Sequence, residues 1–191
     1  MARIALFTGR FQPPTKAHAH TVDKILLQWE RLCIGVSSSK NSGDYDSKWE
    51  SFVKDSMSRF ERNKLIFTPA EVVDMWYGHI RDVDLEERVV CDIIPRPHLR
   101  EFNTVYPPHS YDMVNPGPHS NDSEGDRIRH ELFPKLLERR IWLVQPDFML
   151  HNSEIVRRVR NSASWKEFLT PGTYHVFMRL SGPDRIAKAQ Q

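Results

Sequence analysis

The ten residues from Gly9 to His18, GRFQPPTKAH, combine residue types that suit phosphate binding. A glycine allows a ligand to approach the backbone or gives a positive φ, and the two prolines stiffen the segment. Thr15 can cap a helix that begins directly after it, and the N–H groups at a helix N-terminus attract anions. His18 follows three residues later, so both side chains can point toward one anion. The segment therefore predicts a phosphate site, and its arginine and lysine add positive charge.

A strand and a helix must position this segment. Residues 3–7, RIALF, predict a short buried strand, and residues 17–30 carry apolar side chains at helical spacing. Residues 31–38, RLCIGVSS, predict a second strand. A strand, loop, helix and strand within this length predict a right-handed parallel crossover, with the loop at the carboxyl end of the first strand.

The rest of the chain continues the alternation of strands and helices. Residues 87–95, 110–118 and 140–147 predict three more strands, the first of them covered on both faces because its apolar run is continuous. Thr68, Pro69 and Glu71 predict a helix start with a capping box. We expect an α/β fold, a Rossmann-like doubly wound parallel sheet of about five strands with a C-terminal helical segment.

One domain over residues 1–181 accounts for the whole pattern apart from a polar tail at 182–191. Within it, residues 41–63 predict an insertion or flap, with a short helix around 49–60, and residues 153–181 predict C-terminal helices.

Composition excludes several classes of protein. Lys plus Arg total 27 against 25 for Asp plus Glu, so the charge of +2 argues against a general nucleic-acid partner. No apolar run is long enough to span a bilayer, and the first residues do not form a signal peptide, which predicts a cytoplasmic protein without a membrane partner. Cys33 and Cys91 are expected to be buried thiols.

The opening segment also resembles a known signature. GRFQPPTKAH is similar to the G-R-F-Q-P-x-(H/T)-x-G-H motif of the nucleotidyltransferase superfamily, and its prefix is typical of archaeal-type nicotinamide mononucleotide adenylyltransferases. Weaker similarities follow in CIGVSSSKNS, NKLIFTPAEVVDMW, YDMVNPGP and HNSEIVRRVRN. The resemblance implies transfer of a nucleotidyl group from a nucleoside triphosphate, with ATP as substrate, to a small phosphorylated acceptor. Positioning, Mg²⁺ bound to the substrate and positive charge would suffice for such a reaction, without a protein nucleophile.

The same resemblance assigns roles to residues. His18 would hold the α-phosphate with help from Thr15, while Arg10, Lys40 and a late arginine would hold the β- and γ-phosphates. The late arginine is Arg157 or Arg158, and the N-terminus of its helix at Ser153 would donate backbone N–H groups. The other positions expected to contact nucleotide are Gly9, Phe11, Gln12, Lys16 and Ala17. Acceptor contacts are expected from Asn103, Asn115 and Trp76, and no protein metal ligands are expected.

Departures from the motif leave alternatives open. Ala17 stands where the signature has glycine, which leaves the choice between ATP and CTP open. Val72, in NKLIFTPAEVVDMW, stands where the similar motif of the family has arginine. The favoured activity joins ATP and nicotinamide mononucleotide to give NAD and pyrophosphate. The alternatives are an adenylyl- or cytidylyltransferase acting on another phosphorylated or phosphonylated small molecule, and a non-catalytic nucleotide sensor. A homo-oligomer is suggested by the resemblance alone.

Overall fold

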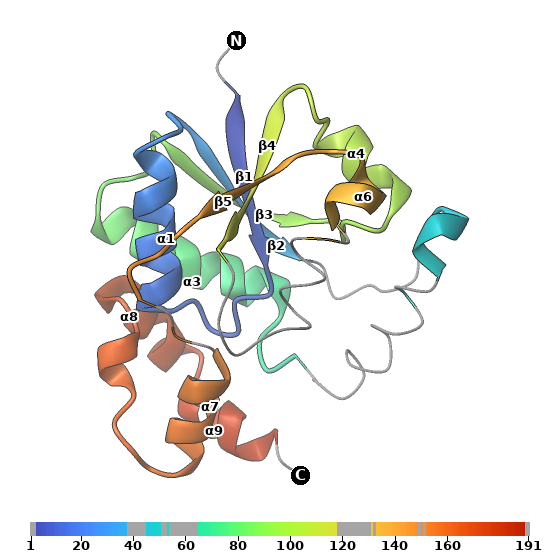
Figure 1. The fold of residues 1–191 in the computed structure, drawn as a ribbon. Coiled ribbons are helices and arrows are strands. Elements are labelled where there is room, and N and C mark those ends of the chain that lie inside the picture. The colour runs from blue at the N-terminus through green and yellow to red at the C-terminus, as the bar shows by residue number, and fades with distance from the viewer. Residues whose placement is uncertain are drawn as a thin grey trace.

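A parallel five-stranded sheet forms the centre of the molecule (Figure 1). The computed structural model describes residues 3–37, 45–50, 53, 65–117, 131, 133–148, 150 and 152–189. The strands lie in the order β3-β2-β1-β4-β5, and each pairs with its neighbours in parallel. Their bounds are Ile4–Gly9 for β1, Leu32–Ser37 for β2, Val89–Ile94 for β3, Tyr111–Pro116 for β4 and Ile141–Val144 for β5.

Helices join the strands and extend the chain beyond β5. Those between strands are α1 (Lys16–Leu26), α3 (Pro69–Asp82), α4 (Arg100–Val105) and α6 (Phe133–Leu137), with a 3₁₀ turn η1 at Ser47–Trp49. After β5 come α7 (Asn152–Arg160), the 3₁₀ turn η3 (Lys166–Phe168), α8 (Pro171–Arg179) and α9 (Gly182–Lys188). The expected Rossmann-like doubly wound architecture is confirmed.

Alternate residues of the strands point to two separate cores. Ala5 and Phe7 of β1 pack with apolar residues of α1, α3, α8 and α9 on one face. Leu6, between them, packs on the other face with residues of η1, α4 and the neighbouring strands. A strand in the middle of the sheet is thus covered on both sides, as the side-chain period of two requires.

The carboxyl ends of β1 and β4 form the switch point of the sheet. From β1 the strand order runs one way through β2 to β3 and the other way through β4 to β5. Phe7 lies beside Val114 in the register, so Asn115 follows at the level where β1 ends. Ligands of such sheets bind outside the carboxyl ends at this point, which places the loop after β1 in the expected position.

The start of α3 agrees with its local sequence signals. Thr68 Oγ1 accepts a hydrogen bond from the backbone N–H of Glu71, and the Glu71 carboxylate accepts one from the N–H of Thr68. Pro69 occupies the first turn. The predicted capping box is confirmed.

Two other expectations are wrong. β3 was expected to be covered on both faces, but it is an edge strand, and Val90 and Ile93 are 45% and 44% exposed. The segment expected to be a polar tail forms α9, because Ile186 is fully buried in the first core. Of the predicted insertion, the structure describes residues 45–50 and 53, where Trp49 is buried in the second core. The rest of the helix expected there lies outside the described residues.

Cys33 and Cys91 are buried thiols on adjacent strands, as expected. Burial is the main reason why the pKa of Cys33 rises to about 12, and it raises the pKa of Cys91 as well. Within the described ranges, no helix combines the length and the apolar character that crossing a membrane requires.

Candidate functional site

The signature segment leaves β1 at Gly9 and turns sharply before α1. Gly9 does not adopt a positive φ, which was one of the two uses expected of it. A Cβ atom at this position would lie 2.7 Å from Cζ of Phe11, so the glycine makes room for that ring. Phe11 itself has a φ of 45°, in the left-handed region that residues other than glycine rarely occupy. This turn directs the Phe11 side chain inward.

The ring of Phe11 lies under His18 and does not face solvent. Phe11 is 3% exposed, and its centroid lies 5.1 Å from that of His18 and 5.2 Å from that of Trp76, both edge to face. Trp76 is fully buried. The expectation that these two rings contact nucleotide and acceptor is therefore not supported, because both belong to the core. Their packing instead restrains the plane of the His18 imidazole.

Thr15 caps α1 as predicted, and its cap is reciprocal with His18. The hydroxyl of Thr15 accepts a hydrogen bond from the His18 backbone N–H at 3.4 Å, while the Thr15 N–H donates to His18 Nδ1 at 3.0 Å. A backbone N–H can only donate, so Nδ1 is the acceptor and the neutral ring carries its proton on Nε2. The loop thus fixes both the orientation and the tautomer of the histidine.

Gln12 joins the signature segment to the start of α3. Its side-chain NH₂ donates to the backbone oxygen of Phe67 at 2.9 Å, and its side-chain oxygen accepts from the N–H of Phe67 at 2.9 Å. Both ends of the amide are therefore used within the protein, which does not support the expected nucleotide contact. This pair of bonds joins the two motifs, which lie 55 residues apart in the sequence.

Two arginines bring positive charge to the carboxyl edge of the sheet. Arg10 follows β1, and Arg96 follows β3. Burial lowers the pKa of each guanidinium, and the charge of Arg10 lowers that of Arg96 further. Like charges brought together in this way favour an anion beside them. Lys16 is exposed at the start of α1, whereas Lys40 lies outside the described residues.

The two asparagines expected to contact the acceptor lie in different places. Asn115 is 3% exposed at the carboxyl end of β4, and its NH₂ group has no hydrogen-bond partner in the described part of the chain. A buried donor of this kind is costly unless a ligand satisfies it. Asn103 lies on α4 and accepts a bond from Arg139, which precedes β5 at the amino edge of the sheet. Asn115 therefore stays a candidate for ligand contact at the carboxyl edge, whereas Asn103 lies at the opposite edge of the sheet.

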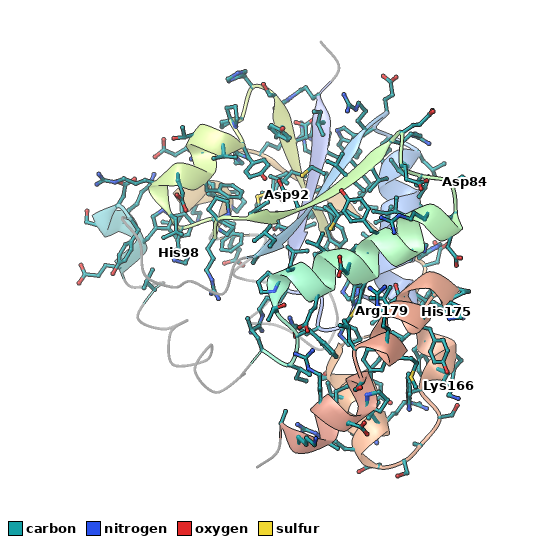
Figure 2. The ribbon with its side chains drawn as sticks, turned by 180° about the vertical axis from the view of Figure 1, so that it is seen from behind. Asp84, Asp92, His98, Lys166, His175 and Arg179 are labelled. Atoms are coloured by element: carbon teal, nitrogen blue, oxygen red, sulfur yellow. The ribbon has the colours of Figure 1, made fainter. Side chains whose placement is uncertain are left out.

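The loop after β3 turns toward η1. His98 is buried, and Figure 2 shows it beside the turn Ser47–Trp49. Its ring lies 6.3 Å from that of Trp49 and 6.1 Å from that of Tyr45. These contacts join the loop to the described part of the segment between β2 and α3.

The late arginines lie in the last turn of α7. Arg157 donates two hydrogen bonds to Glu154, at 2.9 and 2.6 Å, and Arg158 donates one at 2.7 Å. These bonds, that of Arg157 first, lower the pKa of Glu154 to about 2. Arg158 also bonds the backbone oxygen of Ser164, whereas the Arg157 side chain is 61% exposed. Ser153 is exposed in the first turn, and the choice between the two arginines stays open.

A contact that the sequence did not indicate fixes the loop before α7. Asp147 accepts a hydrogen bond from His20 Nε2 at 2.9 Å and pairs with Lys24 at 3.0 Å. Phe148 stacks on His20 with ring centroids 5.4 Å apart. The loop is thereby held on α1, the helix that carries His18. No local signal could have joined residues 127 positions apart.

No family model matches the chain. The nicotinamide-nucleotide adenylyltransferase of Pyrococcus horikoshii is 24% identical over 184 residues, which cover 95% of this chain and 86% of the relative. The resemblance to nicotinamide-nucleotide adenylyltransferases is confirmed. Similar proteins from Pyrococcus furiosus and Thermococcus kodakarensis carry the same name.

Solved adenylyltransferase structures share the fold. A bifunctional NMN adenylyltransferase/ADP ribose pyrophosphatase from Francisella tularensis, complexed with AMP and a manganese ion, has a TM-score of 0.63 at 17% identity. That match covers 98% of this chain and 52% of the bifunctional protein, so the chain spans about half of that length. The nicotinic acid mononucleotide adenylyltransferase of Plasmodium falciparum, complexed with NaAD, has a TM-score of 0.60 at 14% identity, over 96% of this chain and 98% of that one.

Proposed function

We propose that this chain is an adenylyltransferase that transfers AMP from ATP to nicotinamide mononucleotide, giving NAD and pyrophosphate. The observation that carries the proposal is the placement of His18 in the first turn of α1, at the switch point of the sheet, with Nδ1 held by the N–H of Thr15. The resemblance of nearly the whole chain to archaeal nicotinamide-nucleotide adenylyltransferases supports the same activity.

The reaction is an in-line displacement at phosphorus. A phosphate oxygen of the acceptor attacks the α-phosphorus of ATP, and the bond from that phosphorus to the oxygen bridging to the β-phosphate breaks. Pyrophosphate leaves with the electron pair, and no protein nucleophile is needed. The protein contributes by holding the two reactants in line and by placing donors where negative charge grows.

His18 acts on the α-phosphate in this proposal. Its Nε2–H would donate to a non-bridging oxygen, and the N–H groups at the start of α1 would add the field of the helix N-terminus. Because Thr15 and the rings of Phe11 and Trp76 fix the imidazole beforehand, little reorganisation accompanies the reaction.

The β- and γ-phosphates would lie between two groups of cations. Arg10, Lys16 and Lys40 come from the first half of the chain, and the N-terminus of α7 at Ser153 comes from the second half. Arg157 or Arg158 would bind phosphate in exchange for part of its pairing with Glu154. Asn115 would use its buried NH₂ group on the base or the acceptor.

A divalent ion, proposed to be Mg²⁺, would enter with the triphosphate. The described residues contain no group of three or more His, Cys, Asp or Glu side chains that could hold a metal, and the donors at the edge of the sheet are cations and amides. Such a site suits a metal carried by phosphate oxygens and not by a protein cage. When bound, the ion would neutralise charge on the leaving pyrophosphate. A cytoplasmic location accompanies the proposal as the expectation from the sequence, and a homo-oligomeric state accompanies it on the resemblance alone.

The test is pyrophosphate release with ATP or CTP against a panel of acceptors. The panel contains nicotinamide mononucleotide, nicotinic acid mononucleotide and unrelated phosphorylated and phosphonylated small molecules. Turnover with ATP and nicotinamide mononucleotide, with NAD detected, supports the proposal. Turnover confined to CTP or to another acceptor would keep the chemistry but replace the substrate. Binding of ATP without turnover by any acceptor would favour a nucleotide sensor.

A further inference from the structure

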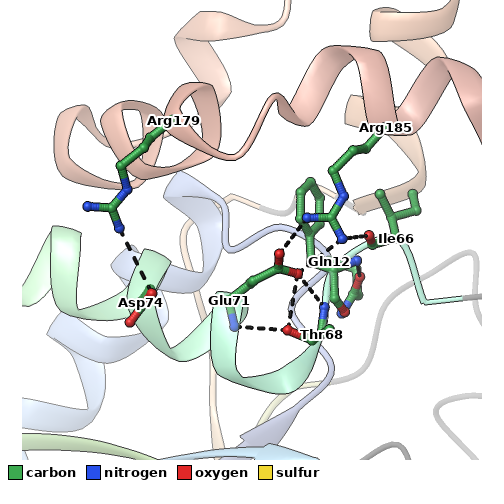
Figure 3. A network of polar contacts seen from close by, with 8 residues as sticks. Gln12, Ile66, Thr68, Glu71, Asp74, Arg179 and Arg185 are labelled. Carbon is green, nitrogen blue, oxygen red and sulfur yellow. Dashed lines mark hydrogen bonds and ion pairs between the residues drawn. The ribbon is translucent and has the colours of Figure 1, made fainter.

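Arg185 of α9 is bound to the start of α3 by a network of polar contacts (Figure 3). Its Nη1 donates to Glu71 Oε1 at 2.6 Å, and its Nη2 donates to Glu71 Oε2 at 3.0 Å and to the backbone oxygen of Ile66 at 2.6 Å. The guanidinium also lies over the ring of Phe67, 4.8 Å from its centroid. Arg185 therefore grips both the capping glutamate of α3 and the two residues before its cap.

These residues are the ones that the signature segment contacts. Phe67 lies between Ile66, which Arg185 binds, and Thr68, whose N–H donates to Glu71. Both backbone groups of Phe67 are hydrogen-bonded by Gln12. Arg185 and Gln12 thus hold the Ile66–Phe67 peptide unit together, Arg185 of the C-terminal helix at its carbonyl and Gln12 of the loop after β1 at its N–H.

The contact continues from Gln12 to the histidine. Gln12 directly follows Phe11, whose ring packs edge to face against His18. A shift of Phe67 would move Gln12, and with it the strained turn at Phe11 on which the imidazole rests. Val72, which stands in place of the arginine of the similar motif, is fully buried, and the guanidinium that pairs with Glu71 is that of Arg185 on α9.

From this arrangement we propose that Arg185 is a positioning residue for His18, acting through segment 66–68, Gln12 and Phe11. The proposal rests on the proposed function only in that turnover is one of its readouts. It adds the C-terminal helix to the parts of the molecule that determine the rate. A purely structural contact would stabilise the fold without this effect on the reaction.

The kinetic test compares arginines on two neighbouring helices. Arg179 of α8 pairs with Asp74 of α3 at 3.9 Å, an exposed pair that does not touch segment 66–68 (Figure 3). Arg185→Met should lower kcat by at least about ten-fold with little change in the KM for ATP, because a small misplacement of a positioned group affects the transition state most. Arg185→Lys should recover part of the loss. Arg179→Met should stay within about two-fold of the original rate.

A double-mutant cycle tests the route. If Arg185 acts through Gln12, the loss of kcat in Arg185→Met combined with Gln12→Ala should not exceed the larger single loss by more than about two-fold. A loss of kcat in the double variant equal to the product of the two single losses would overturn the route. An Arg185→Met kcat equal to that of Arg179→Met, measured well below both melting temperatures, would overturn the proposal itself.

Amide hydrogen exchange keeps this test separate from the proposed function. The Phe67 N–H should exchange at least about ten-fold faster in Arg185→Met than in the original chain. In Arg179→Met the exchange rate of this N–H should equal that of the original chain. An unchanged Phe67 amide in Arg185→Met would refute the positioning contact whatever the enzyme does. Faster exchange in a chain without NAD synthesis would instead refute the proposed activity alone.

Discussion

His18 and Thr15 hold each other at the start of α1, with the Thr15 N–H donating to His18 Nδ1 at 3.0 Å and the Thr15 hydroxyl accepting from the His18 N–H at 3.4 Å. The position that usually bears a glutamate in a capping box bears a histidine here. One pair of residues therefore serves two purposes, because the cap of the helix also sets the tautomer of the imidazole.

Replacing His18 by alanine should affect turnover far more than binding. Its contact with the α-phosphate strengthens as charge develops, so kcat should fall roughly 10²- to 10³-fold while the Kd for ATP changes only a few-fold. Steady-state kinetics and calorimetric titration measure the two quantities. His175→Ala, at an exposed position of α8, is the matched control and should leave both unchanged. Equal losses in kcat and affinity would remove His18 from the chemical step.

The hydroxyl of Thr15 should matter for both stability and rate. Thr15→Val removes the cap while keeping the backbone N–H, so it should cost about 1 kcal/mol of unfolding free energy and lower kcat less than His18→Ala does. Thr15→Ser retains the hydroxyl and should restore most of both. Urea unfolding and initial rates are the measurements. A valine variant as stable and as fast as the serine variant would show that the hydroxyl has no such function.

Local signals made the helix starts predictable, whereas contacts between residues far apart in the sequence could not be predicted. The cap at Thr15 and the capping box at Thr68 depend on residues three positions apart, so the sequence indicates both, although the return bond from His18 to Thr15 was not predicted. The order of strands and helices was equally accessible, because it follows from periodicity. Phe11 and Gln12 have the residue types of the motif but act on Trp76 and Phe67, more than 50 positions away.

The C-terminal helix illustrates the same limit. Ile186 is the one large apolar side chain of α9, and this buried isoleucine together with the paired Arg185 makes the segment part of the fold. Neither partner surface can be inferred from the segment itself. The exposed face of β3 has a comparable cause, since an apolar run does not tell whether a strand lies in the middle or at the edge of a sheet.

Deleting residues 182–191 should therefore destabilise the protein. The deletion loses the burial of Ile186 and the bonds of Arg185, together roughly 3 to 5 kcal/mol of unfolding free energy. Deleting residues 190–191 alone is the control and should leave the melting temperature unchanged. A full deletion that melts with the original chain would mean that α9 contributes nothing to the fold.

Stability should also fall in mild acid because of His79. This residue is 6% exposed on α3, and neither of its ring nitrogens has a hydrogen-bond partner within the described part of the chain. Burial lowers its pKa below the ordinary 6.5, against the opposing charges of Asp23 and Asp82. Between the folded and unfolded pKa values the unfolded chain binds more protons. The contribution of neutral His79 to the free energy of unfolding is therefore present above about pH 6.5 and is lost as the pH falls toward the pKa of the folded state.

Urea unfolding at pH 7.5 and 5.5 measures this contribution. The difference in unfolding free energy between the two pH values should be smaller in His79→Leu than in the original chain. His109→Gln, at an exposed histidine before β4, should leave the difference unchanged. If the leucine variant kept the whole difference, the acid sensitivity would have to come from other groups.

The fate of labelled phosphate tests the central claim most directly. With Mg²⁺ and nicotinamide mononucleotide, ATP labelled at the α-phosphate should give labelled NAD, and ATP labelled at the γ-phosphate should give labelled pyrophosphate in equal amount. Label from the γ-phosphate in inorganic phosphate, with ADP as the partner product, would contradict adenylyl transfer. So would the absence of label in NAD under conditions in which the chain binds both substrates.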